Sequence, residues 1–212
     1  MVQQLGYVYN GNMTSNDNIV NIALDRPRYH HGDLRAAAVA AGLALLEERS
    51  VDDFALREVA RRIGVSATAL YRHFPDKQAL LGAIAAAGLV TLGERQREAS
   101  EAAGDPLHAF VESGIAYVRF AIDHPSLFRL VFATASAEPI LDSPRGTGGS
   151  AMDQLRDNIA RFVADDSSNE AQKAAALGAW ALVHGLAMLV LDGQTPDDPE
   201  LIARVIRQMV PG

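Results

Sequence analysis

Cysteine is absent from the 212-residue chain, and its absence excludes several kinds of chemistry at once. A chain without thiols forms no disulfide, no thiolate-bound zinc or iron–sulfur site and no cysteine nucleophile. A long apolar run is also missing, since no stretch approaches the ~18 uninterrupted apolar residues that suggest a membrane span. The nearest approach, 176–191, contains His184 and two glycines, and we interpret it as a buried helix.

A secretory signal is missing too, because no basic segment precedes an apolar core near the N-terminus. The lack of an export signal and the lack of cysteine together favour a cytoplasmic protein with no membrane partner.

The remaining composition is that of an ordinary globular protein, with 49% hydrophobic and 21% charged residues. A length of 212 residues fits one domain, or one domain with a small appended module. The formal net charge of −7 excludes a uniform polycation, but the charge is unevenly distributed. Residues 26–80 hold nine Lys and Arg against seven Asp and Glu, whereas residues 81–212 hold ten against seventeen.

Apolar residues recur at steps of three and four along most of the chain, which predicts helices. Residues 1–25 are rich in Asn, Gln and Gly and lack this period, so we interpret them as a flexible extension. Asp33 and Asp76 are suited to cap helices, and Gly64 to end one. No strand pattern competes, so we predict an all-α fold with helices at about 34–48, 56–63, 67–73, 77–101, 106–124, 126–133, 151–163, 170–191 and 200–210.

Segment 56–74, LREVARRIGVSATALYRHF, has the pattern of a helix-turn-helix. The small Ala60 permits a close helix crossing, and Gly64 permits the sharp turn. The second helix, of about seven residues, is about 10 Å long and fits a DNA major groove about 12 Å wide. By spacing alone, a helical hairpin in an all-α core explains the segment equally well.

The polar residues that follow the turn favour DNA, because their side chains suit contact with phosphates. They are Ser66, Thr68, Tyr71, Arg72, His73 and Lys77. The start of the next helix adds backbone N–H donors, which also bind phosphate.

Two longer stretches, YHHGDLRAAAVAAGLALLEERS and FALREVARRIGVSATALYRHFPDKQALLGAI, resemble the DNA-binding domain of TetR/AcrR-type bacterial transcriptional regulators. The resemblance implies a three-helix DNA-binding head at 26–80 and a helical effector-binding and dimerisation domain at 81–212. It also implies a homodimer that binds a palindromic double-stranded DNA operator. On this resemblance, the phosphate contacts fall to Tyr71, His73 and Lys77, and the groove-facing residues are Ser66, Ala67, Thr68, Ala69 and Arg72.

One position departs from the family pattern. The residue before the first helix of the pair is usually a Thr or Ser that caps the helix, and here it is Ala55. We expect Asp53 to supply part of that cap.

The groove-facing helix is poor in residues that read bases, since alanines offer only apolar contact and Arg72 alone suits a guanine. We therefore expect DNA shape and an arm before the first helix to contribute, with the arm entering the minor groove. The predicted arm contacts are Arg26, Arg28, Tyr29, His30 and His31. The alternative for the two histidines is a solvated helix start; we predict no metal site, cofactor or catalytic residue.

The C-terminal half is similar to the variant ligand domain named for its Trp-His-Gly, here Trp180, His184 and Gly185. Aromatic residues on three predicted helices, with a few polar ones, predict an apolar cavity for a small hydrophobic or aromatic effector. The candidate residues are Phe110, Tyr117, Arg119, Phe120, Phe128, Phe132, Trp180, His184 and Met188. For each aromatic residue taken alone, core packing is the alternative.

Small residues on the last two helices predict a four-helix interface between two copies of the chain. The alternative there is a bundle within one subunit. The function that we predict is a ligand-responsive transcriptional repressor, in which effector binding changes the spacing of the two heads. A helical small-molecule-binding protein without DNA binding, or an enzyme, are the alternatives.

Overall fold

A computed structural model describes residues 34–133, 150–160 and 169–208. The predicted extension 1–25 and the predicted arm contacts Arg26, Arg28, Tyr29, His30 and His31 lie outside the described residues. The described residues form α-helices and no strands, which confirms the predicted all-α class. The helices are α1 (Leu34–Glu48), α2 (Leu56–Arg62), α3 (Ala67–Tyr71), α4 (Lys77–Ala102), α5 (Pro106–Asp123), α6 (Pro125–Ala133), α7 (Ser150–Ala160), α8 (Asn169–Leu191) and α9 (Pro199–Arg207).

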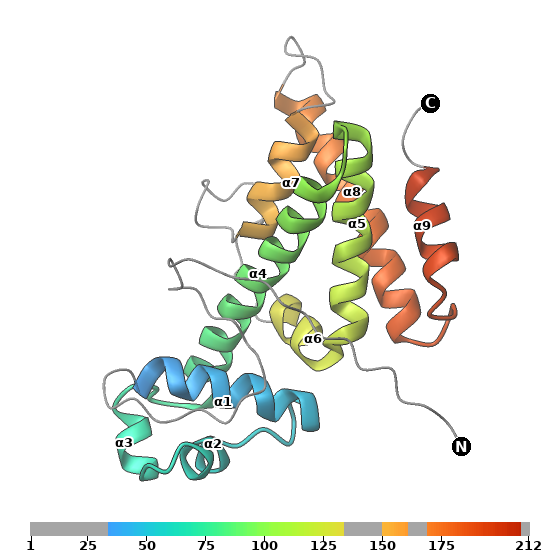
Figure 1. Ribbon diagram of the computed structural model, residues 1–212. Helices are drawn as coiled ribbons and strands as arrows, with labels where there is room; N and C mark the ends of the chain where they lie inside the picture. The colour runs from blue at the N-terminus through green and yellow to red at the C-terminus, as the bar shows by residue number, and fades with distance from the viewer. Residues whose placement is uncertain (1–33, 134–149, 161–168, 209–212) are drawn as a thin grey trace, which may run out of the picture.

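Helices α1, α2 and α3, with the first turn of α4, form a small N-terminal unit that we call the head (Figure 1). Its core is built from side chains predicted to hold the helix pair, with Val59 and Leu70 fully buried. Gly64 has φ 72°, a left-handed conformation that side chains other than glycine disfavour, and it makes the turn between α2 and α3. Ser66 begins α3 by accepting a hydrogen bond from the backbone N–H of Ala69.

Helix α4 joins the head to the remainder of the protein, which we call the body (Figure 1). It has 26 residues and is therefore about 39 Å long. Asp76 caps it, with the carboxylate accepting from the N–H of Ala79 at 2.8 Å. The predicted boundary at residue 80 falls inside this helix, so a continuous helix rather than a flexible linker connects the two parts.

In the body, α5 lies between α4 and α8, α7 packs beside α4, and α9 lies on the outer side (Figure 1). Close packing fixes α6 against α4, because a Cβ built on Gly88 would lie 2.9 Å from Leu127 Cδ1 and 3.1 Å from Val131 Cγ2. Helix α6 also contacts α1 and so lies where the head meets the body.

Helix α8 was predicted to be buried, and this prediction is wrong for the single chain. Helix α8 is long and apolar enough to span a membrane by length and composition, but only 22% of its apolar window is buried. Leu177 and Leu189 are about half exposed. Because α8 packs on α5, α7 and α9 through its other side, its exposed face has the character of an interface between proteins rather than of a core.

Candidate nucleic-acid interface and ligand-binding cluster

The outer surface of α3 and the turn after it presents polar side chains to solvent. Thr68, Tyr71, Arg72 and His73 are exposed, and Tyr71 retains 45% of its surface although it is a large aromatic residue. Ala67 and Ala69 are half-buried, so they add only small apolar patches to this face. The predicted contact residues of α3 thus lie together on the protein surface rather than in its core.

Two predicted contact residues already have partners within the head. The Oγ of Ser66 caps α3, as described above. The ammonium of Lys77 donates to the backbone carbonyls of Val51 and Asp52, at 2.8 and 3.2 Å. Lys77 therefore tethers the loop after α1 to the start of α4 and keeps one of its three N–H groups for another acceptor.

Ala55 begins α2 without a side-chain cap, as the sequence indicates. Asp53 does not replace it, which corrects our expectation: its carboxylate instead accepts a hydrogen bond from the Ser50 hydroxyl at 2.9 Å. Ser50 and Lys77 therefore hold the middle of the loop between α1 and α2, and the first N–H groups of α2 have no side-chain acceptor.

Ion pairs hold α2 in place. Arg62 pairs with Glu48 at the end of α1, and Arg61 pairs with Glu58 within α2. The hydrogen bonds from Arg61 lower the pKa of Glu58 to about 2. Arg57 is exposed and, among the described residues, has no ion-pair partner, so sequence reasoning missed an available cation of the head. Its place in the first turn of the predicted helix was the available signal.

In the body, Tyr117, Trp180 and His184 form a hydrogen-bonded group. The indole N–H of Trp180 donates to the Tyr117 hydroxyl at 3.1 Å, and that hydroxyl lies 3.0 Å from His184 Nδ1. Burial raises the pKa of Tyr117 and lowers that of His184, so both side chains are neutral near pH 7. Because the indole N–H donates to the Tyr117 oxygen, the hydroxyl keeps its own proton for a further hydrogen bond, and His184 Nδ1 lies within reach of it.

Two phenylalanines of α6 complete this group, which we call the aromatic cluster: Tyr117, Phe128, Phe132, Trp180 and His184. The ring centroids of Phe132 and His184 are 4.7 Å apart, and those of Phe128 and His184 are 5.5 Å apart. Tyr117 and Phe128 are buried, whereas Phe132, Trp180 and His184 remain partly exposed. The cluster thus joins α5, α6 and α8 and leaves part of its aromatic surface exposed.

Four other predicted ligand residues have different surroundings. Phe120 is buried beside His124, with the Arg95 guanidinium 5.5 Å above its ring. Arg119 forms an ion pair with Asp197 at 2.6 Å, in the connection between α8 and α9. Phe110 and Met188 are half-buried, Met188 one turn beyond His184 on α8. The structure thus brings five of the nine predicted ligand residues into one cluster.

Sequence reasoning missed a buried polar group between α4, α5 and α7. All four buried polar or charged residues of the described chain occur there: Gln96, Ser100, Ser113 and Asn158. Gln96 Nε2 donates to the backbone oxygen and to the hydroxyl of Ser113, each at 3.3 Å, and Ser100 donates to the Ala109 carbonyl at 3.1 Å. The sequence carries no signal for this group, because Gln96 and Ser100 lie in the polar C-terminal half of α4.

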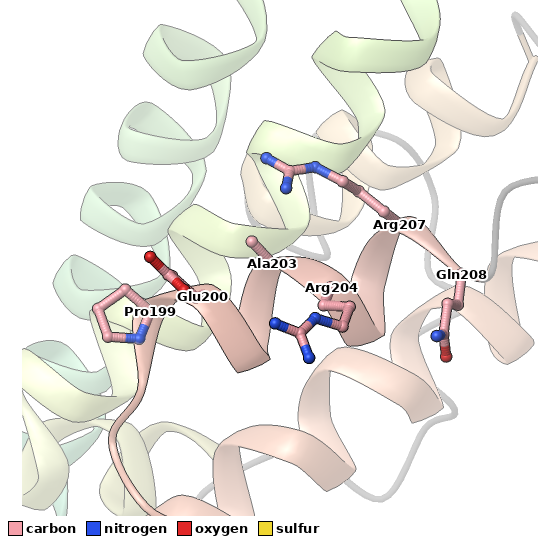
Figure 2. Close-up of a pocket in the computed structure, with 6 residues that line it drawn as sticks. All are labelled: Pro199, Glu200, Ala203, Arg204, Arg207 and Gln208. Atoms are coloured by element: carbon pink, nitrogen blue, oxygen red, sulfur yellow. The ribbon is translucent and has the colours of Figure 1, made fainter.

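A separate hollow of about 630 Å³ lies on α9 (Figure 2). Its lining residues are Pro199, Glu200, Ala203, Arg204, Arg207 and Gln208, and Figure 2 shows that they all come from α9 and its end. One helix cannot enclose a small molecule, so we do not assign the effector to this hollow. No group of three or more potential metal ligands occurs in the ranges that the structure covers.

Comparison with known proteins gives two matches to the same family, in both parts of the chain. Residues 38–84 match the family described as bacterial regulatory proteins, tetR family, and residues 110–210 match the tetracyclin repressor-like C-terminal domain. The chain belongs to the TetR family. The protein is therefore a ligand-responsive DNA-binding transcriptional regulator.

Individual relatives agree with this assignment over most of the chain. An uncharacterised HTH-type transcriptional regulator of Haemophilus influenzae is 28% identical over 180 residues, which cover 82% of this chain and 85% of the relative. A Rhodococcus protein of unknown function has a TM-score of 0.66 and 31% identity, covering 86% of this TetR-family chain and 94% of its own. A TetR variant from Acinetobacter baumannii, solved in complex with minocycline, has a TM-score of 0.58 and 20% identity. The match covers 82% of this chain and 90% of the TetR variant.

Proposed function

We propose that this TetR-family regulator is a cytoplasmic repressor that binds a palindromic operator as a homodimer and is released by a small apolar or aromatic effector. The observation that carries the proposal is the exposed polar face of α3 beside the capped start of α4. Membership of the family favours this function over the two alternatives from the sequence, a DNA-free binding protein and an enzyme.

For the head, which we place at 26–80, we propose that Tyr71, His73 and Lys77 contact phosphates. The exposure of Tyr71 and His73, and the backbone N–H groups at the start of α4, support this role. We assign the major groove to α3, through Ser66, Ala67, Thr68, Ala69 and Arg72, and the minor groove to the arm with Arg28, Tyr29, His30 and His31. Arg57 is a further phosphate contact that we add from its exposed, unpaired charge.

For the body, which we place at 81–212, we propose dimerisation through the exposed face of α8 together with α9. Leu177 and Leu189 lie on this face, and Gly178 and Gly185 leave open space where a Cβ would be. An apolar helix surface with small residues allows a second copy to approach closely. Two copies of α8 and α9 then form a four-helix interface.

Effector binding is coupled to the head through α6 in this proposal. Phe128 and Phe132 belong to the aromatic cluster, whereas Leu127 and Val131 on the same helix press against Gly88 of α4. A ligand that moves α6 therefore acts directly on the helix that carries the head.

A second connection runs from the body to α1 through His124, which directly precedes α6. His124 Nδ1 lies 2.7 Å from Glu47 Oε1, and Arg95 Nη2 lies 2.9 Å from His124 Nε2. Because arginine only donates, Nε2 accepts and Nδ1 donates to the Glu47 carboxylate. This link, which we call the Glu47–His124 link, ties the orientation of the head to the position of α6.

The proposal is tested by fluorescence anisotropy with duplex DNA at increasing salt. We expect Tyr71→Phe and Lys77→Ala to weaken binding to all duplexes alike, and the loss of the Lys77 charge to flatten the salt dependence. Thr68→Ala and Arg72→Ala should instead change which operator is preferred. Arg97→Ala is the matched control, because Arg97 lies on the same helix as Lys77 but pairs with Glu101, far from the head.

Lys77→Ala also removes the tether to the loop after α1, so its melting temperature is recorded beside its DNA affinity. Unchanged DNA binding in all four head variants would contradict the assignment of this face.

A further inference from the structure

The side-chain oxygen of Gln96 is a buried acceptor without a hydrogen-bond partner in the described part of the chain. Gln96 lies on α4 and is 6% exposed. Its amide orientation is fixed, because the backbone oxygen of Ser113 only accepts and must therefore face Nε2, 3.3 Å away. The opposite end of the amide, Oε1, is left unsatisfied, which is an unfavourable state for a buried polar atom.

The other buried polar side chains between α4, α5 and α7 are uncharged: Ser100, Ser113 and Asn158. Ser100 donates to the Ala109 carbonyl, and Gln154 Nε2 lies 3.4 Å from Ser100 Oγ and 3.4 Å from Asn158 Oδ1. A charged group placed among these partners would lose its hydration without gaining an opposite charge. The group that suits the free oxygen of Gln96 is therefore a neutral hydrogen-bond donor, such as a hydroxyl.

This polar group continues into the aromatic cluster along α5. Ser113, the partner of Gln96, lies four residues before Tyr117, so the two side chains share a helix face and are about 6 Å apart along the axis. Tyr117 in turn contacts His184 and Phe132. A molecule of two fused rings has the length needed to connect the two groups.

We propose that the effector is a neutral aromatic molecule that carries a hydroxyl group. The hydroxyl donates to Gln96 Oε1, and the rings lie against Phe132, Trp180 and His184. This inference rests on the proposed function, in which the body binds an effector. It adds the ligand's hydrogen-bonding chemistry and a recognition residue outside the aromatic cluster.

The test is isothermal titration calorimetry of the full-length protein, without DNA, with three matched probes: naphthalene, 2-naphthol and 2-naphthoate. We expect 2-naphthol to bind about tenfold more tightly than naphthalene, the gain expected for one satisfied buried acceptor. The carboxylate of 2-naphthoate has no proton to donate at neutral pH, so this probe should bind most weakly.

Gln96→Leu and Gln96→Met remove the acceptor while keeping a side chain of similar size. A melting curve of each variant shows whether it is folded. Both should reduce the preference for 2-naphthol over naphthalene to near onefold, with naphthalene affinity unchanged within about twofold. Gln194→Leu is the control, because Gln194 is exposed in the connection between α8 and α9, and it should keep the full preference.

Three results would overturn the inference: no binding of 2-naphthol, equal binding of the three probes, or a preference that persists in the folded Gln96 variants. A crystal structure that keeps a water molecule on Oε1 beside bound 2-naphthol would also overturn it. If 2-naphthol binds through Gln96 but leaves operator affinity unchanged, the inference stands and the proposed release mechanism fails. If other compounds release DNA and 2-naphthol does not bind, the release mechanism stands and the inference about Gln96 fails.

Discussion

The candidate sites of the head and of the body differ in how their residues are distributed along the chain. In the head, the proposed DNA contacts that the structure describes lie within about twenty consecutive residues, 57–77, and most of their side chains are exposed. In the body, the aromatic cluster and Gln96 are supplied by four helices, from α4 to α8, and lie mostly inside. A short sequence therefore specifies the first surface, whereas only the packed fold assembles the second.

The two parts also differ in the exposed surface that they leave for partners. The head presents hydroxyl, imidazole and guanidinium groups, which suit phosphates. The body presents the apolar face of α8, on which Leu177 is 51% exposed. Binding through the head should therefore weaken as the salt concentration rises, whereas association through α8 should weaken when its apolar area is reduced.

Charged substitutions on the exposed face of α8 should produce the largest effect on DNA binding. They should separate the two subunits, so that only one head binds the operator. We expect Leu177→Asp with Leu189→Asp to yield monomers in sedimentation velocity and to weaken operator binding about 100-fold or more, the loss expected when two linked sites become one. Leu107→Asp is the matched control, since Leu107 is an exposed leucine of the body on α5. A charged double variant that stays dimeric would contradict the proposed interface.

A cap added to α2 should stabilise the head by a smaller amount. Ala55→Thr provides an acceptor for the free N–H groups at the start of α2 and should raise the free energy of unfolding by about 1 kcal/mol. Urea denaturation followed by circular dichroism measures the change. Ala86→Thr, at an exposed site within α4, should not stabilise the protein, and equal gains in both variants would exclude capping as the cause.

Removal of the Glu47–His124 link should affect the response to effector more than DNA binding itself. For Glu47→Gln we expect operator affinity within about twofold of the wild type, and a reduction of the effector response by about threefold, since partly exposed pairs contribute under 1 kcal/mol. The assay is anisotropy with and without 2-naphthol. Glu101→Gln breaks a pair inside α4 and should leave both values unchanged.

The smallest effect concerns pH. Burial lowers the pKa of His184 below its ordinary value of 6.5, so the unfolded chain binds this proton more readily than the folded protein does. Stability from the neutral imidazole is therefore present above pH 6.5, decreases as the pH falls below that value, and levels off below the pKa of the folded state. His184→Asn keeps an acceptor for Tyr117 and should flatten the melting temperature between pH 7 and 5. A slope that is unchanged in this variant would assign the effect to other groups.

The sequence predicted the fold class, the positions of the helices and the exposed face of α3, because each depends on local periodicity, caps and one glycine turn. Predicted and observed helix ends differ by one or two residues at most places, for example at Arg62 and Tyr71. Asp53 was assigned wrongly because the nearer Ser50 hydroxyl competes for its carboxylate.

The body was harder to predict. Arg119 follows Tyr117 by two residues, so it lies on the opposite side of α5 and pairs with Asp197. Phe120 lies one turn beyond Tyr117, where it packs beside His124. Gln96 was missed because a single glutamine carries no sign of burial until α5 and α7 are packed around it.

Helix α4 places the proposed ligand-sensing atom and the proposed phosphate anchor on one rigid rod. Gln96 and Lys77 are nineteen residues apart on it, a separation of about 28 Å. A tilt of about 5° at the sensing end would displace the anchor by roughly 2.5 Å. In a twofold assembly the second copy of α4 would move by the same amount, in the direction related by the 180° rotation. A small molecule that never contacts the duplex can in this way change the distance between the two phosphate contacts, so that it no longer matches the DNA helical repeat of about 34 Å.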